Sequence, residues 1–310
     1  AVHLYQPRAA YRSRSGGFFR HLAGVGQGAP AGAIVDYWLK EKPQGAVALK
    51  ILDAQGRVAA VFSSAKKRAP AGAGSAAFRR GPRLPSHAGL SRFIWNERYP
   101  RPRPIPGIGH WGFAQGVLVP PGHYQVQLTA AGHTFDARLE IRPDPRVHAS
   151  AADYQQQFAL AQKIVAQINA IDDAVNQMRA VRKQLAALDH RLAGQPRARP
   201  VVAAAQRLDG AIRKVAAALA DTRIQSDEDA LNYPIRLNDK FANLEGTVEG
   251  SDNAPTAQAY AVYRYLSAQL APQLAAWRSL QRTQLAALNR LMQASGVLAI
   301  APPHLPGAAR

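Results

Sequence analysis

The chain of 310 residues contains no cysteine, so it can form neither a disulfide bond nor a thiolate nucleophile or metal ligand. This absence is compatible with the cytosol and also with many bacterial secreted proteins. Aromatic residues make up only 7% of the chain, and methionine occurs twice. No apolar run approaches the roughly 18 to 20 residues that a membrane-spanning helix needs. Acidic residues are scarce as well, since 20 Asp and Glu face 39 Lys and Arg, which gives a net charge of +19.

The positive charge is concentrated in the first half of the chain. Residues 1–150 hold 21 Lys and Arg against 7 Asp and Glu, a net charge of +14, whereas residues 151–310 carry only +5. A field of this sign attracts polyanions such as nucleic acid, anionic lipid or acidic glycans. An Arg-rich and Ala-rich composition without a polyanion partner is the simpler interpretation, so polyanion binding through the basic first domain is kept as an alternative function.

Motifs for catalysis and for cofactor binding are missing from the sequence. It has no Gly-x-Ser-x-Gly nucleophile turn, no Walker A loop and no His-Glu-x-x-His zinc motif, and its nine histidines lack the spacing of metal ligands. Gly107–Gly112 matches Gly-x-Gly-x-x-Gly, but prolines precede it where a dinucleotide site requires a strand. We therefore expect no catalytic residue, no metal and no cofactor.

Short strands are predicted in the first half of the chain. Runs rich in β-branched and aromatic residues, bounded by turn residues, occupy 33–39, 47–52, 57–62, 92–99, 124–128 and 135–141. Together they predict a small β-sandwich over residues 33–145, with Trp95 in its core. Residues 1–32 are Gly-rich and basic without apolar periodicity, so we expect an extended linker that follows an upstream segment, and residues 63–88 are expected to form a mobile loop.

Helical periodicity replaces this pattern after residue 150. Ser150 and Asp153 fit a capping box, and apolar residues then recur from Tyr154 to Leu192 about every 3.5 residues, the period of packed helices. Further periodic segments span 201–224, 234–248 and 256–292. The sequence thus predicts an α+β multidomain protein, with an antiparallel bundle of about four helices over residues 150–296 and a disordered tail over 297–310.

Three segments carry a family resemblance: Gly89–Pro100, Pro120–Val126 and Asp229–Phe241. In this order they resemble the C-terminal region of large bacterial secreted glycosyl hydrolases with neuraminidase (BNR) repeats or a sortilin-like β-propeller. The resemblance implies an immunoglobulin-like sandwich similar to the flagellar hook-cap type, a following helical region, an upstream propeller as partner, and a periplasmic or secreted location. The propeller's Ser-x-Asp-x-Gly-x-x-Trp pattern occurs nowhere in this chain, so no catalytic residue is carried over.

The expected function is that of a non-catalytic accessory module that braces such a propeller or binds a protein or an envelope glycan. A second alternative is part of a sialidase-like glycoside hydrolase whose active site lies in the propeller, and nucleic acid is not an expected partner. One contact surface is predicted around Arg101, Arg103, His110 and Trp111, because a loop aromatic beside basic residues can stack on a sugar or a base. In the competing interpretation Trp111 packs on the end of the sandwich or on the propeller.

Two groups of acidic residues could be taken for a carboxylate pair and a calcium loop, but we expect neither site to be present. Asp172 and Asp173 are adjacent on a predicted helix, where neighbouring side chains diverge, so we expect both to be solvated. Asp227-Glu228-Asp229 lacks the alternating oxygens of a calcium loop. Negative charge before a helix N-terminus accounts for it.

Overall fold

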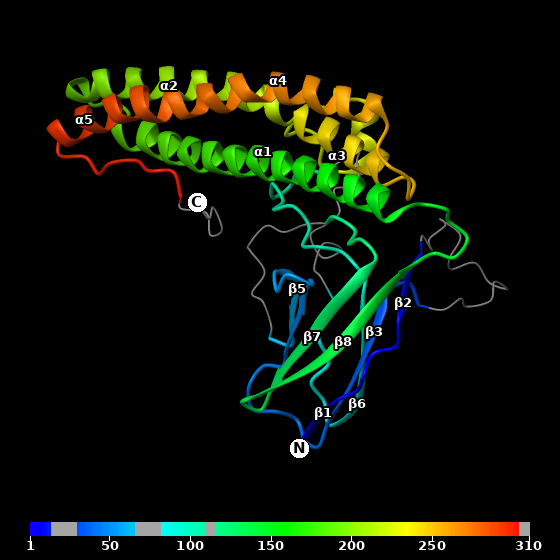
Figure 1. Ribbon diagram of the computed structural model, residues 1–310. Helices are drawn as coiled ribbons and strands as arrows, with labels where there is room; N and C mark the ends of the chain where they lie inside the picture. The colour runs from blue at the N-terminus through cyan, green and yellow to red at the C-terminus, as the bar shows by residue number, and fades with distance from the viewer. Residues whose placement is uncertain (14–29, 66–81, 110–115, 304–310) are drawn as a thin grey trace. The chain divides into compact units, whose positions relative to one another are not determined.

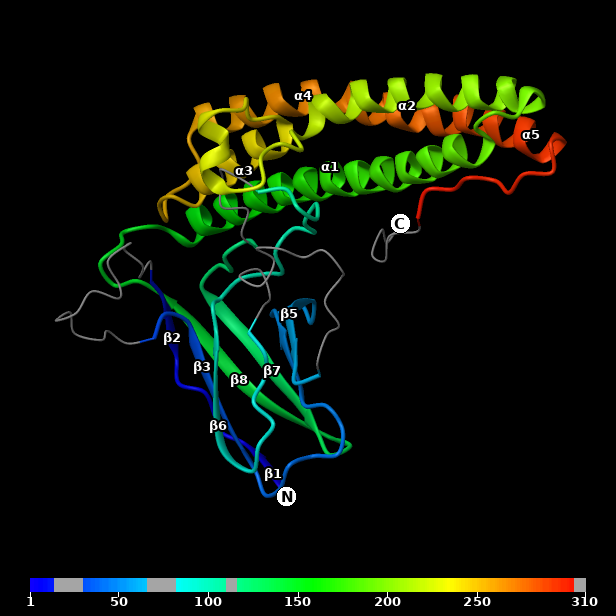
Figure 2. The ribbon, with the colours of Figure 1, turned by 180° about the vertical axis from the view of Figure 1, so that it is seen from behind.

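The chain folds into an α+β protein with two compact units (Figures 1 and 2). The computed structural model describes residues 1–13, 30–65, 82–109 and 116–303. The β unit comprises residues 1–101, 115–162 and 249–255, and the helical unit comprises residues 102–114, 163–248 and 256–310. The sandwich was predicted to end at residue 145 and the bundle to begin at residue 150, and three stretches differ from this division. The first turns of the long helix and residues 249–255 count with the strands, and residues 102–114 count with the helices.

The described strands form two sheets. One has the order β1-β3-β6 and is antiparallel throughout, with strands β1 (Val2–Leu4), β3 (Ala33–Leu39) and β6 (Gly89–Trp95). The other has the order β2-β8-β7-β4-β5, with strands β2 (Ala10–Arg12), β8 (His133–Pro143), β7 (Gly122–Ala130), β4 (Ala48–Leu52) and β5 (Val58–Ser63). In this sheet β2 runs parallel to β8, and the other neighbours are antiparallel.

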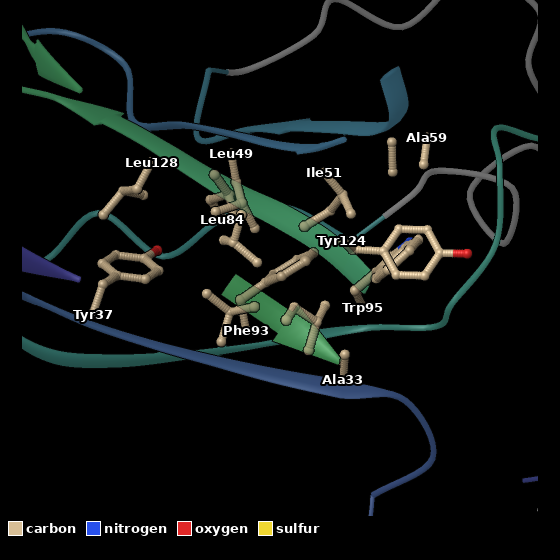
Figure 3. Close-up of a cluster of buried hydrophobic side chains, with 14 of the residues drawn as sticks. Ala33, Tyr37, Leu49, Ile51, Ala59, Leu84, Phe93, Trp95, Tyr124 and Leu128 are labelled. Atoms are coloured by element: carbon tan, nitrogen blue, oxygen red, sulfur yellow. The ribbon is translucent and has the colours of Figure 1, made fainter. Parts of the chain in front are cut away.

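Both sheets contribute to one hydrophobic core, part of which is drawn in Figure 3. Successive residues of a strand point to opposite faces, and strands such as β3 and β7 bury every second side chain accordingly. The buried set includes Val35, Tyr37, Leu39, Leu49, Ile51, Phe93, Trp95, Tyr124, Val126, Leu128, Leu139 and Ile141. The predicted core position of Trp95 is confirmed: its ring lies edge-on to Tyr124 with centroids 5.8 Å apart, and its Nε1 donates to the carbonyl oxygen of Arg98 at 3.1 Å.

Gly32, directly before β3, has a backbone conformation that favours glycine. Its φ is +118°, and a Cβ there would lie 2.1 Å from the carbonyl oxygen of Trp95. Strand β3 begins at the next residue, Ala33, which pairs with Trp95. Glycine is therefore required for β3 to start in register against β6.

The interpretation of residues 1–32 as a linker is wrong for residues 2–4 and 10–12. Strand β1 pairs with β3 in one sheet and strand β2 pairs with β8 in the other. Strands of three residues are too short to show an alternating pattern, which explains why the sequence did not reveal them. Residues 14–29, and residues 66–81 of the predicted mobile loop, lie outside the described residues.

The described helices are α1 (Ala151–Leu192), α2 (Arg199–Leu219), α3 (Leu237–Val248), α4 (Ala257–Leu280) and α5 (Ala286–Ala294). Helices α4 and α5 are joined by a π turn at Gln281–Leu285, and short 3₁₀ turns occupy Pro196–Ala198 and Asp227–Leu231. None of the helices in the described part of the chain combines the length and the apolar character needed to cross a bilayer.

The predicted start of the first helix is confirmed by its hydrogen bonds. The backbone N–H of Ser150 donates to Asp153 Oδ2 at 2.8 Å, and the N–H of Asp153 donates to Ser150 Oγ at 3.2 Å. The predicted start at Pro234 is wrong, because α3 begins three residues later, at Leu237. Phe241 and Leu244, which lie on one face of α3, are buried, as the helical period over 234–248 implies.

Side-chain hydrogen bonds join α1 to its neighbours in the helical unit. Arg182 Nε donates to Asp209 Oδ1 of α2 at 2.7 Å, and Trp277 Nε1 of α4 donates to Gln177 Oε1 at 3.1 Å. In Figures 1 and 2, α1 runs alongside both α2 and α4, in agreement with these bonds.

The predicted disordered tail is wrong for its described part, residues 297–303. Ile300 is buried, its N–H donates to Asn289 Oδ1, and its carbonyl oxygen accepts from Asn289 Nδ2, both at 2.8 Å. The side-chain amide of Asn289 on α5 therefore satisfies both backbone groups of Ile300 and holds this segment against the helix. Residues 304–310 lie outside the described residues.

Candidate functional site

The predicted contact surface contains a residue that is committed to another contact. Arg103 makes a two-pronged ion pair with Asp173 of α1, in which Nε donates to Oδ1 at 2.8 Å and Nη2 donates to Oδ2. Its backbone N–H donates to Asn169 Oδ1 at 2.9 Å. Arg101 is exposed, whereas His110 and Trp111 lie outside the described residues, so only half of the surface is observed.

Residues 102–109, which we call the strap, follow helix α1 within the helical unit. Asn176 Nδ2 donates to the carbonyl oxygen of Pro104 at 3.2 Å, and Arg179 Nη1 donates to that of Pro106 at 2.6 Å. Ile105 and Ile108 are buried. Proline has no backbone N–H and so cannot donate to a regular strand or helix. Here the carbonyl oxygens of Pro104 and Pro106 accept hydrogen bonds from side chains of α1 instead.

Asp172 and Asp173 are not solvated as expected, and Asp173 is bound by the strap. Asp172 is fully buried and Asp173 holds the guanidinium of Arg103. Both carboxylates support the positive charge of Arg103 and raise the pKa of that group, with the Asp173 hydrogen bond as the main cause. A helical pattern shows which residues share a face but not that a distant segment covers it.

A buried charge cluster lies in the β unit and was not predicted. It consists of four buried residues and the partly buried Arg98; the four are Arg12, Glu97, Glu249 and Asp252. Because a charge is costly to bury unless it is paired, such a cluster marks either a structural tie or a functional site.

Arg12 of strand β2 is one centre of the cluster, and its side chain is only 2% exposed. Its Nη2 donates to Gln157 Oε1 at 2.6 Å, and its Nη1 lies 3.4 Å from Asp252 Oδ1. The guanidinium carbon is 4.8 Å from the centre of the Tyr154 ring. Gln157 in turn donates to the carbonyl oxygen of Ser251. Arg12 thus attaches both the first turns of α1 and the segment 249–255 to the sheet.

Arg98 forms the second centre. Its Nη1 donates to Glu249 Oε2 at 2.5 Å and to the carbonyl oxygen of Gly116 at 2.8 Å. The other oxygen of Glu249 accepts from the backbone N–H of Leu118 at 2.7 Å. Glu249 therefore closes a contact between the two short segments that form the isolated bridge Arg98–Leu118.

Glu97 is the most perturbed carboxyl of the cluster. Its side chain is buried, its backbone φ is +58°, and burial raises its pKa to about 7 against the opposing fields of Arg12 and Arg98. The other four members carry two positive and two negative charges, so the cluster is neutral when Glu97 is protonated. Its Oε1 accepts no hydrogen bond from the described residues. A buried oxygen without a donor costs less free energy in a neutral carboxyl than in a carboxylate, which agrees with the raised pKa.

A carboxyl with a pKa near 7 has the acidity of a general acid or base, but a substrate must reach it. Near the cluster the structure has an open hollow of about 350 Å³, lined by Asp144, Arg146, Val147 and Asp252. Glu97 is not among the lining residues. The geometry therefore favours a structural role for the cluster.

Replacing Glu97 by glutamine is expected to change how stability depends on pH. In the folded chain the carboxyl keeps its proton up to about pH 7, whereas in the unfolded chain it loses it near 4.5. Stability should therefore fall as pH rises from about 4.5 to 7, by about 3 kcal/mol in total, and stay level above that range. Urea unfolding between pH 4 and 9 measures this loss.

The Glu97→Gln variant cannot ionise, so it should lack this decline and be the more stable protein at pH 8. Glu41→Gln, at an exposed position, is the matched control and should leave the curve unchanged. A decline of the same size in Glu97→Gln would show that Glu97 is not the titrating group.

Nothing in the sequence pointed to this cluster. Arg12 lies in a stretch without periodicity, and its partner Asp252 is 240 residues further along the chain. The described residues contain no group of three or more His, Asp or Glu side chains placed to hold a metal ion.

Two comparisons with known proteins identify no relative of the chain. No protein-family model matches it, and no curated protein matches it significantly. Its class is therefore stated from the fold alone: an α+β protein of two units, in which the arginines of the strap and of the buried charge cluster bind carboxylates of the same chain.

Proposed function

We propose that the chain is a non-catalytic accessory module of a larger secreted β-propeller protein, which braces the propeller or binds a protein or an envelope glycan. The observation that supports a non-catalytic role is the buried charge cluster. Its perturbed carboxyl, Glu97, lies outside the neighbouring hollow, and its arginines bind carboxylates and carbonyl oxygens of the same unit. The propeller partner and the periplasmic or secreted location rest on the sequence resemblance described above.

Within this proposal the β unit is an immunoglobulin-like sandwich. The course of the first residues supports a two-sheet sandwich, because the chain passes from one sheet to the other. Strand β1 pairs antiparallel with β3 in one sheet, and β2 pairs parallel with β8 in the other. Tyr124 adds to it: its hydroxyl donates to the carbonyl oxygen of Pro120, four residues upstream, at 2.7 Å. A tyrosine bonded in this way at the start of a late strand is typical of such sandwiches.

The helical unit is proposed to be an antiparallel bundle. The bonds from α1 to α2 and α4 support this arrangement, as does the buried apolar seam from Ile168 through Ile171, Val175, Met178 and Val181. A rigid bundle without a described metal cluster suits a structural or spacing role.

A hydrolysis panel tests the non-catalytic role. The full chain is incubated with chromogenic aryl glycosides and sialosides, alongside the Glu97→Gln variant. We expect neither protein to release chromophore above the rate of the buffer. Release by the native chain that is lost in Glu97→Gln would contradict the non-catalytic role and would place an active site within this chain.

Polyanion binding through the basic first domain is the second candidate, supported by the +14 charge of residues 1–150. It predicts retention on heparin that falls steeply with salt. Neutralising Arg79, Arg80, Arg83, Arg101 and Arg103 together should abolish retention. Arg103 is already paired with Asp173, so most of the effect must come from the other four, and unchanged retention would exclude this function.

A further inference from the structure

The outer face of the sheet β1-β3-β6 gathers aromatic and charged side chains. His3, Trp38 and Leu90 lie directly opposite one another across the three strands. Two residues further along, Asp36 pairs with Arg92 in the same register. Their neighbours Tyr37 and Leu39 point into the core, so these side chains point outward.

Tyr5 extends this face beyond the end of β1. Its backbone N–H donates to the carbonyl oxygen of Asp36 at 3.1 Å, and its ring lies edge-on to His3 with centroids 4.6 Å apart. The rings of Tyr5 and His3 and the side chains of Trp38 and Leu90 thus occupy one small area. We call the six residues His3, Tyr5, Asp36, Trp38, Leu90 and Arg92 the outer-face patch.

The outer-face patch is accessible to solvent, although apolar side chains on the face of a sheet are usually covered by other parts of a protein. Tyr5 is 43% exposed and Leu90 is 60% exposed. Arg92 Nε and Nη2 each donate to Asp36 at 2.8 Å, which locks the guanidinium in place. That side chain still has an exposed fraction of 58%, so its remaining N–H groups are held in a fixed position at the surface.

We propose that the outer-face patch binds a neutral saccharide. A pyranose ring presents C–H groups on its flat faces and hydroxyls around its rim. The C–H face fits an aromatic ring, whose π surface carries partial negative charge. The hydroxyls fit an ordered carboxylate–guanidinium pair that can accept and donate at once. Neighbouring strands are about 4.8 Å apart, so the patch matches the size of one or two sugar rings.

The charge and the size of the patch argue for this ligand over other occupants. Asp36 and Arg92 cancel each other, so the patch offers no net field to a polyanion. A stable protein partner or a second copy usually needs about 20 to 30 residues on each side, far more than six. The site shares no residue with the buried charge cluster, so its test is independent of the non-catalytic role.

Titration of the full chain with neutral hexasaccharides tests this site. The probes are chitohexaose and cellohexaose, with a heparin hexasaccharide as the charged comparison, and binding is followed by calorimetry and tryptophan fluorescence. We expect saturable binding of at least one neutral probe with a Kd below about 1 mM. Trp38→Ala should weaken it at least about tenfold, and Tyr5→Ala, at a more exposed position that leaves folding intact, should weaken it about threefold.

Tyr265→Ala is the matched control, because Tyr265 is 65% exposed on α4 and should not affect binding. Three outcomes would overturn the proposal. One is the absence of neutral-saccharide binding at about 10 mM ligand. Another is binding of heparin alone. The third is self-association that is lost in Tyr5→Ala and Trp38→Ala without saccharide binding, which would assign the patch to a second copy of the chain.

Discussion

Replacing Arg12 by methionine is expected to lower the free energy of unfolding of the β unit by about 3 to 5 kcal/mol, because it breaks a buried ion pair. Methionine keeps much of the apolar volume and removes the charge. Asp252 then loses the positive charge that lies 3.4 Å from it, and Gln157 loses its donor at 2.6 Å. The variant should also loosen the segment 249–255, because Gln157 donates to Ser251 there.

Urea unfolding of the full chain measures the loss, and two further variants make it specific. Arg138→Met changes an exposed arginine of β8 in the same unit and should cost little. Adding Asp252→Asn to Arg12→Met removes the buried charge that the first change leaves behind, so part of the stability should return. Equal small effects for Arg12→Met and Arg138→Met would mean that the arginine is not structurally important.

Replacing Gly32 by alanine is expected to destabilise the β unit by more than about 3 kcal/mol, since strain and steric overlap act together. The φ of +118° is one that side-chain-bearing residues rarely adopt, and the new Cβ would lie 2.1 Å from the carbonyl oxygen of Trp95. Neither group can yield easily, because Trp95 is buried and pairs with Ala33.

Gly45→Ala provides the control for Gly32→Ala. A Cβ at Gly45 meets nothing within 4 Å, and its φ is not positive. That variant should be neutral or gain about 0.5 kcal/mol through the lower entropy of the unfolded chain. Thermal unfolding of both proteins separates the two, and similar melting temperatures would contradict the geometry at Gly32.

Strands and helices were predictable where a hydrophobic pattern was long enough to be periodic. The alternation of Leu49 and Ile51 in β4 and of Tyr124, Val126 and Leu128 in β7 survives in the structure as buried positions. The seam from Tyr154 to Leu192 is likewise mostly buried along α1. In both cases one face of an element packs against a core, and the sequence records that face directly.

The features that were missed depend on segments far apart in the chain. Arg103 of the strap pairs with Asp173, 70 residues further along the chain, and the buried charge cluster joins residues near 12, 98, 157 and 250. A single arginine in a polar stretch has the same local pattern whether it ends in solvent or in a buried pair. Its partner is set by the tertiary fold, which no local period encodes.

The outer-face patch lies between these two cases. Trp38 was placed correctly in a strand, but its outward direction follows from the pairing of β3 with both β1 and β6. His3 and Tyr5 join it only because the first residues of the chain form an edge strand. The sequence alone placed them in a linker, so no aromatic patch was predicted.

The structural role of the buried charges is tested most directly by the coupling energy between Arg98 and Glu249. It is obtained from the unfolding free energies of the native chain, Arg98→Met, Glu249→Gln and the double variant. Glutamine can still accept from the N–H of Leu118, so the cycle isolates the contact of 2.5 Å between the two charges. A structural tie predicts a coupling of about 1.5 to 3 kcal/mol. A coupling near zero would contradict it.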